Sequence, residues 1–293
     1  KIDIQPLEAQ EQNAWNAGES AFVANQFKID KPNVSAHYFK GAAAFEFDLT
    51  VPDTLYRSAF TSESQMGSFL SSIFKTMETS MTMHINFLTR GVIAGAIGEK
   101  LHGGKYVDLL GLYNTAAGET ITAGAALQDP AFLKFAGKTI RDYIKYMADP
   151  SVLYNDADMI RATQRDDMHV LLNTSLVSAY STYLESDTFN RDLLELPYFT
   201  EVKYWQGTGT TAPNDVDNTT ISVTTKDGTE ITKQYVLGML ADRQAISTGL
   251  TDRFEAADRN NRERYTNYTS GATLQHCVDL SENIVVFTLG ALA

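Results

Sequence analysis

Residues 62–101 constrain the fold of this chain more than any other stretch. They contain no proline, begin with a capping-box pattern at 62–65, and are followed by Gly103-Gly104, a helix-terminating signal. At ~1.5 Å per residue such a helix approaches ~60 Å, whereas the mean helix has only ~11–12 residues. Apolar residues recur along it every three or four positions, namely Met66, Phe69, Leu70, Ile73, Phe74, Met77, Met81, Ile85, Leu88, Val92, Ile93, Ala96 and Ile97. The pattern predicts one long helix whose apolar stripe belongs to the core, with a bend at Gly91 or Gly95.

The segments before this helix favour extended structure. Residues 45–51 alternate apolar and polar side chains, which is the period of a strand with one covered face. Pro52-Asp53 then predicts a turn, and residues 56–60 a returning strand, so we expect a long hairpin. Residues 1–36 have few periodic apolar positions and many Gln, Asn, Glu and Ala residues. Such a segment buries little against itself, so we expect an extended arm that lies along another surface.

The remainder of the chain interleaves helices and strands without a regular βαβ alternation, which predicts an α+β fold. Asp129-Pro130 begins a helix that ends before Asp149-Pro150, and Asp227-Gly228 is a strong hairpin turn between two short strands. We expect the charged stretch 253–264 to be a solvated or interface face. The remaining elements expected are helices at 175–185 and 188–195 and strands at 168–172, 201–205, 235–240, 265–278 and 283–289.

Composition narrows the functional classes. The 293 residues carry a formal net charge of −12, which argues against a protein that binds free nucleic acid, because such proteins present a basic face. An apolar fraction of 43% is ample for a packed core. Cys277 is the only cysteine, so no intrachain disulfide forms, and we expect a chain suited to a reducing cytoplasm. The most apolar stretches, such as 284–289, are too short for a transmembrane helix.

A search for chemical motifs finds none that is complete. The five histidines have no metal-ligand spacing, and residues 98–105 imitate a phosphate-binding loop but follow a helix, with Tyr106 where Ser or Thr is needed. Acidic pairs at 156–158 and 166–167 fall in expected loops, and residues 214–217 lack the spacing of a calcium loop. We therefore expect no catalytic, cofactor-binding or metal-binding residues, and a protein that is not an enzyme.

Three stretches resemble a known family. Val51 to Leu70 resembles the join between extended loop and spine helix in major capsid proteins of tailed double-stranded-DNA bacteriophages, which have the Hong Kong 97-type fold. Residues 166–174 look like the strand that opens their axial domain, and 241–246 like the strand end at which that domain returns. Residues 265–289 resemble the long closing strands of their peripheral domain. The resemblance covers nearly the whole chain in its order of elements.

The resemblance implies a division of the chain and a function. The implied parts are an N-terminal arm (1–36), an extended loop (37–61), a peripheral domain with its spine helix (62–165, helix 62–101), an axial domain (166–252) and a return to the peripheral domain (253–293). The implied function is self-assembly into hexamers and pentamers of an icosahedral shell that encloses DNA without sequence-specific binding. Such a protein is assembled in the host cytoplasm, belongs to the virion, and has portal, scaffold or decoration proteins as partners but no membrane.

Two alternatives remain open at this point. An encapsulin-like cargo shell shares the fold, but residues 1–36 lack the amphipathic helix that would dock cargo; genome neighbourhood distinguishes the two. A soluble enzyme without a recognisable motif would elute from gel filtration as a small oligomer. One further expectation concerns the polar loop 206–219: near a capsomer axis, Asp215 and Asp217 of each copy would form an acidic ring.

Overall fold

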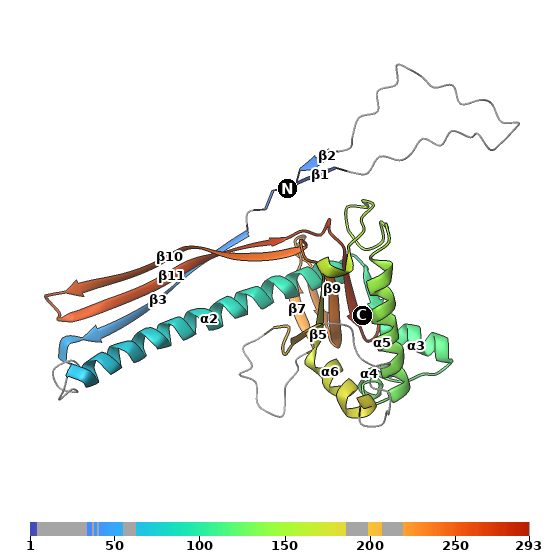
Figure 1. Cartoon of the computed structure of the whole chain (residues 1–293), viewed down its shortest axis with the longest axis horizontal. Helices are drawn as coiled ribbons and strands as arrows, with labels where there is room; N and C mark the ends of the chain where they lie inside the picture. Colours follow the sequence, from blue (N-terminus) through green and yellow to red (C-terminus); the bar gives the residue numbers. More distant parts are fainter. Residues whose placement is uncertain are drawn as a thin grey trace, which may run out of the picture.

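The predicted long helix is present as one unbroken element in the computed structural model (Figure 1). Helix α2 spans Glu63–His102, 40 residues, which confirms the prediction of one long helix. It ends in a Schellman motif: Lys105 N donates to the Lys100 carbonyl over 3.0 Å and Gly104 N to that of Leu101 over 3.2 Å. Gly104 has φ +68°, which glycine adopts without strain. The structure describes residues 1–4, 34–36, 38–39, 41–54, 63–185, 199–206 and 219–292.

A three-stranded antiparallel sheet runs alongside α2 (Figure 1). Its strands, in the order β10-β11-β3, are β10 (Ile246–Asn260), β11 (Tyr265–Val278) and β3 (Gly41–Pro52). The strand predicted at 45–51 is confirmed, and the partner that the structure gives it is β11. The returning strand predicted at 56–60 lies outside the described residues. We call β3, β10, β11 and residues 63–90 of α2 the extension.

The other end of the molecule is built on a five-stranded sheet in the order β4-β12-β9-β5-β6. Its strands are β4 (Tyr106–Asp108), β12 (Ile284–Thr288), β9 (Val236–Asp242), β5 (Met168–Asn173) and β6 (Thr200–Val202). The β12–β4 and β5–β6 pairs are parallel, and the other two are antiparallel. We call this sheet and the elements that pack on it the compact part.

Helices and a hairpin surround this sheet. The helical elements are α3 (Leu109–Ala117), α4 (Ala123–Ala126), α5 (Pro130–Tyr146), η1 (Arg165–Asp167), α6 (Thr174–Tyr180) and the π-helical η2 (Ser181–Glu185). The hairpin joins β7 (Ile221–Thr224) to β8 (Glu230–Lys233) through the predicted Asp227-Gly228 turn. The helix expected at 188–195 lies outside the described residues, as does most of the loop expected at 206–219.

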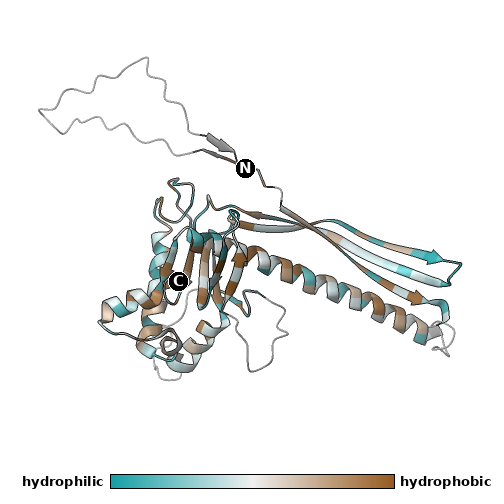
Figure 2. Cartoon of the chain, turned by 180° about the vertical axis from the view of Figure 1, so that it is seen from behind, coloured by the Kyte–Doolittle hydropathy of each residue, from teal (hydrophilic) through white to brown (hydrophobic). Residues whose placement is uncertain are grey.

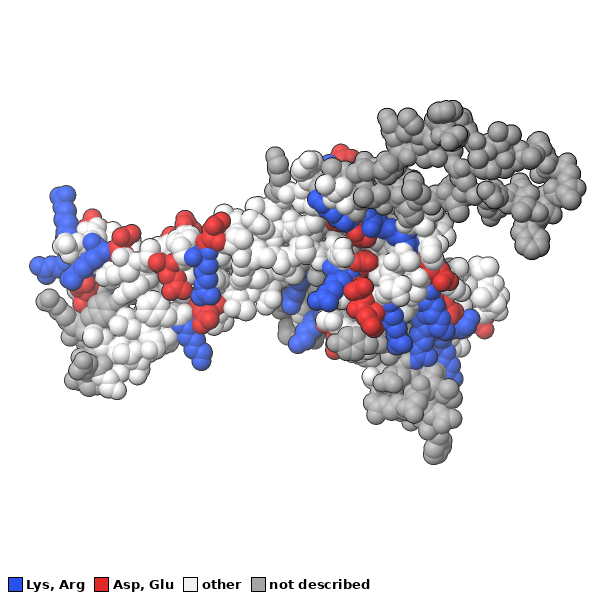
Figure 3. Space-filling view, turned by 45° about the horizontal axis from the view of Figure 1, so that its top comes forward, with Lys and Arg blue, Asp and Glu red and all other residues white. Residues whose placement is uncertain are grey.

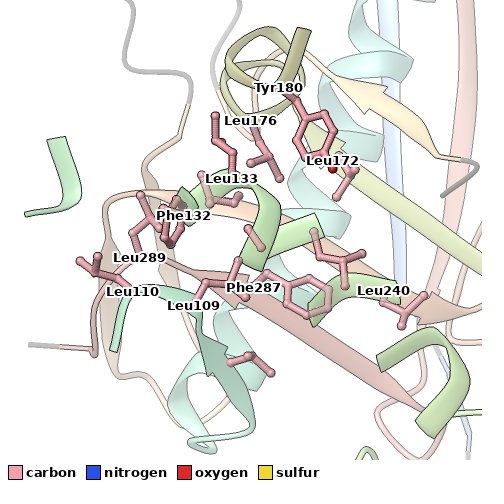
Figure 4. Packing of buried hydrophobic residues seen from close by; sticks show 14 of the residues in the cluster. Leu109, Leu110, Phe132, Leu133, Leu172, Leu176, Tyr180, Leu240, Phe287 and Leu289 are labelled. Carbon is pink, nitrogen blue, oxygen red and sulfur yellow. The ribbon is translucent and has the colours of Figure 1, made fainter. Parts of the chain in front are cut away.

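Two hydrophobic cores lie on the five-stranded sheet. The first packs α3, α5 and α6 against it, and Figure 4 shows Phe132 and Leu133 of α5 grouped with Leu172, Leu176 and Phe287. The second core packs the C-terminal end of α2 and the β7–β8 hairpin against β9 and β12. Its buried members include Ile97, Leu101, Trp205, Met239 and Val286. Strands β9 and β12 contribute to both cores, which explains their continuous apolar sequences.

The domain division expected from the resemblance stays a prediction, but two of its boundaries cross continuous structure. The first core joins Phe132 to Leu172, which lie on either side of the boundary at residue 165. Strand β10 runs from Ile246 to Asn260 through the boundary at residue 252. A division by packing would instead separate the extension from the compact part.

Candidate assembly surface

The sheet of the extension is held on α2 largely by aromatic side chains. The ring of Phe45 lies edge-on to His84 at 4.7 Å between centroids, and Phe74 meets Tyr268 in the same manner at 5.3 Å. Along β3, alternate side chains starting from Gly41 are partly buried, and the residues between them are exposed. One face of the sheet therefore covers α2, while its other face is open to solvent.

Large apolar side chains of the extension stay exposed in the single chain. The helical stripe was predicted to be core, and for Phe74 that prediction is wrong: its side chain is 48% exposed. Four others on α2 or β10 are similarly exposed, namely Met83, Phe87, Leu250 and Phe254. Figure 2 shows apolar residues along the whole length of α2, although a single narrow sheet covers only one side of it. The compact part also exposes large apolar side chains, such as Tyr146 and Leu153, but those of the extension follow one helix and one strand, and an apolar surface of that kind marks an interaction site.

The extension also presents two strand edges. In the described part of the chain, β3 and β10 are the outer strands of their sheet, so each has one edge without a hydrogen-bonded neighbour. These edges are 12 and 15 residues long, and unpaired edges of this length are templates for pairing with another chain. Charges along β10 restrict such pairing to a suitable partner: Arg259 pairs with Asp53 at 3.0 Å and Arg253 with Glu255 at 3.2 Å. Figure 3 shows charges of both signs along the extension.

An apolar groove lies where the extension meets the compact part. It has a volume of about 360 Å³ and runs between α2, the base of the sheet and the β7–β8 turn. Phe87 and Val92 line its helix side, and Leu274 its sheet side. A Cβ placed on Gly91 or Gly95 would meet no atom within 4 Å. These glycines leave the helix surface open, so another backbone could approach closely.

Buried polar contacts fix the C-terminal end of α2 within the compact part. The fully buried Lys100 ammonium, near the end of α2, donates to the Asp156 carboxylate over 2.8 Å and to the Tyr154 carbonyl over 3.2 Å. Burial lowers the pKa of Lys100, and the Asp156 carboxylate opposes that effect. A buried amine with a charged partner and a carbonyl is costly to separate from them. The contacts therefore fix the direction in which the extension leaves the compact part.

The first residue of the chain is also fixed to the compact part. The Lys1 ammonium pairs with Asp279 at 2.7 Å and with Glu282, which in turn binds Arg161 at 3.0 Å. Strand β1 (Ile2–Ile4) then pairs with β2 (Val34–Ala36). Lys1 therefore lies on the compact part of its own chain, where the carboxylates near the β11–β12 turn attract it, and the surface on which the rest of the arm lies stays a prediction. Residues 5–33 lie outside the described residues.

The residues considered for chemistry have structural roles where the structure describes them. Residues 98–102 belong to the end of α2, which confirms that 98–105 is a helix end and not a phosphate loop. Asp242 accepts hydrogen bonds from the Thr163 hydroxyl and from Gln244 N, both over 2.8 Å. Burial raises the pKa of the Cys277 thiol, which disfavours the thiolate that a nucleophile needs. Asp215 and Asp217 lie outside the described residues.

Two other kinds of feature are absent from the described residues. Among the described residues, no three His, Cys, Asp or Glu side chains gather closely enough to hold a metal ion. In the same part of the chain, no helix combines the length and apolar character needed to cross a bilayer.

Comparison with known families decides between the remaining readings. The sequence pattern of the Phi29-like phage major capsid protein family matches residues 2–288. The chain belongs to that family. No curated protein matches the chain. The family assignment favours a phage shell over an encapsulin-like one and makes the chain a structural component of a virion.

Solved structures agree with the family in fold. The chain is similar to one in the capsid structure of Staphylococcus phage Andhra, with 12% identity, a TM-score of 0.61, and coverage of 99% of this chain and 80% of that one. It is similar to a chain in the structure of the head fiber and inner core protein gp22 of native bacteriophage P68, with 11% identity, a TM-score of 0.61, and coverage of 98% of this chain and 80% of that one. It also resembles a chain in the capsid structure of cyanophage P-SCSP1u, with 10% identity, a TM-score of 0.55, and coverage of 99% of this chain and 82% of that one. The capsid protein therefore has the expected Hong Kong 97-type α+β fold.

Proposed function

We propose that this capsid protein forms hexamers and pentamers of an icosahedral shell around double-stranded DNA, with the extension as the main surface between subunits. The observation that carries the proposal is the incomplete burial of the extension. Phe74 of α2 and Phe254 of β10 are 48% and 46% exposed, and both outer strands of the three-stranded sheet have an open edge in the described chain. Neighbouring subunits would cover these side chains, because obligate interfaces are rich in apolar contacts.

The proposal changes the domain division that the resemblance implied, so that it follows the packing of the chain. The extension corresponds to the extended loop and peripheral domain of the family, and the compact part to its axial domain. This division keeps both hydrophobic cores in one unit. We further propose that the protein has no catalytic activity, that shells assemble in the host cytoplasm, and that portal, scaffold or decoration proteins are its partners.

Electron microscopy of the purified protein, with and without a scaffold protein, tests the proposal. Closed shells of hexamers and pentamers are the expected result. A matched pair of variants assigns the contacts: Phe254→Asp on the open face of the sheet, and Glu201→Gln on the exposed surface of β6 in the compact part. The first variant should stop shell formation and the second should not. Normal shells from Phe254→Asp would show that this face is not an interface.

A further inference from the structure

A row of three lysines follows one face of α5, on a chain whose net charge is −12. Lys134, Lys138 and Lys145 are spaced by four and seven residues, so they lie within one narrow strip of the helix. We call these three residues the α5 basic stripe. Figure 3 shows Lys and Arg side chains gathered on the compact part in the region of α5.

The helix is oriented so that this strip points away from the core. The opposite face of α5 buries Phe132, Leu133, Ala136 and Ile140. The three lysines of the stripe are exposed, and Arg141 is half-buried. The apolar positions of α5 thus fix which side faces the solvent, and that side is basic along ~16 Å, eleven residues at ~1.5 Å each.

Little within the described chain neutralises the stripe. The one carboxylate of α5 is Asp142, which lies 3.6 Å from Lys138, a side chain that is 76% exposed. An exposed pair at this distance is weak and leaves the lysine available to other anions. With three lysines and one carboxylate, this side of the helix keeps a net charge of +2 without counting Arg141.

We propose that the α5 basic stripe contacts the phosphate backbone of the enclosed DNA, without reading its sequence. A phosphate backbone is a regular row of anions, and lysine and arginine side chains in a row can bind it through charge alone. Elsewhere the acidic chain repels DNA, so contact would be confined to this face. The inference rests on the proposed function, because it requires the shell to enclose DNA with α5 on its inner side.

A second copy of the chain is the alternative occupant, and its described helices fit less well. The carboxylates of α2 are Glu63, Glu78 and Glu99, which are too far apart along the helix to match the stripe. The helices α3, α4 and α6 contain no acidic residue. DNA therefore matches the length and regular spacing of the stripe better than these surfaces do.

Lysine acetylation with a small reagent, read by mass spectrometry, tests the inference in unassembled subunits, empty shells and DNA-filled particles. Lys134, Lys138 and Lys145 should react in the first two states and be protected in filled particles. Lys203, an exposed residue directly after β6, serves as the reference for general accessibility. Equal reactivity of the stripe in empty and filled shells would overturn the inference. So would protection already present in empty shells, because the stripe would then face another subunit.

A charge-removal variant tests the same inference in solution. Binding of unassembled protein to a short random-sequence DNA duplex is measured as a function of salt for K134Q/K138Q/K145Q and for a control, R165Q/K203Q/R243Q, with the same loss of charge from scattered exposed positions. The stripe variant should reduce the slope of log affinity against log salt by about 3, since each phosphate contact contributes ~0.9. Equal slopes for the two variants would contradict the inference. A failure of the proposed function is distinguishable, because shells would then be absent from the outset.

Discussion

The compact part and the extension of this capsid protein bury their side chains to very different extents. Every residue of β12 is buried, whereas most of β10 is exposed over its 15 residues. The contrast also divides α2, where Ala96 and Ile97 near its C-terminal end are inaccessible, while Phe74 is 48% exposed. One helix thus runs from a region whose apolar side chains are buried within the chain into a region where several of them stay exposed. Under the proposed function, neighbouring subunits cover this second region.

The largest effect is expected in the compact part. Phe132→Ala removes a fully buried ring from the first core and should lower the free energy of unfolding by ~3–5 kcal/mol. Denaturant unfolding of the unassembled protein measures this change. A loss below ~1 kcal/mol would show that the compact part does not depend on its own core, and would remove the contrast between the two regions.

The matching change in the extension should have a smaller effect on the subunit. Phe74→Ala removes a half-exposed ring whose contact is the edge-on pair with Tyr268, and such pairs contribute ~0.5–1.5 kcal/mol. Unfolding should therefore change by about that amount, while the yield of shells, measured by sedimentation, should fall much further. A stability loss equal to that of Phe132→Ala with unchanged shell yield would mean that Phe74 belongs to an internal core.

A substitution at a glycine in the groove should change the stability of the subunit and the yield of shells in opposite directions. Gly91→Ala adds a Cβ that meets nothing within 4 Å, so helix propensity should stabilise the free subunit by ~1 kcal/mol. Shell yield should nevertheless decrease if a neighbouring backbone uses the open surface of α2. Gly98→Ala is the control on the same helix, because its Cβ would overlap Val223 and destabilise the subunit itself. An increase in both stability and yield for Gly91→Ala would show that the groove is not an interface.

The smallest effect is expected at the hairpin turn that packs on the end of α2. The Thr225 hydroxyl and then the backbone N–H of Thr229 lower the pKa of Asp227 to about 2 from 3.8, with His102 2.9 Å away as a further contribution. Because the folded pKa is depressed, this carboxylate stabilises the fold above pH ~4, and the contribution is lost as the pH falls through about 2.

The Asp227→Asn variant tests that expectation through the difference in stability between the variant and the parent protein. The variant should be slightly less stable than the parent at neutral pH, and the two stabilities should converge as the pH falls from about 4 to about 2. Urea unfolding over this range measures the difference. A constant difference across the window would show that the ionised carboxylate contributes nothing.

Local signals in the sequence were sufficient for the elements whose geometry is local. The stripe from Met66 to Ile97 predicted α2, and Asp227-Gly228 predicted the β7–β8 hairpin, because helix periodicity and turn chemistry depend on neighbouring residues alone. Asp129-Pro130 likewise begins α5, where the Asp129 carboxylate accepts from Ala131 N over 3.0 Å.

The sheet of the extension was less predictable. Strand β10 was not expected as a strand, because both of its faces are largely exposed and charged residues replace the usual alternation. The pairing of β11 with β3 joins segments about 220 residues apart, which no local pattern specifies. The exposure of Phe74 was missed for a related reason, since the sequence shows an apolar stripe but not how narrow a sheet covers it.

Hydrogen–deuterium exchange, compared between unassembled subunits and assembled shells, tests the central claim most directly. Amides of β9 and β12 should be protected in both states, because the two cores bury them in the single chain. Amides of β3 and β10, whose outer edges are open in the described chain, should exchange quickly in the subunit and become protected in the shell. Equal exchange of β3 and β10 in the two states would contradict the account, because it would mean that neighbouring subunits do not cover the extension.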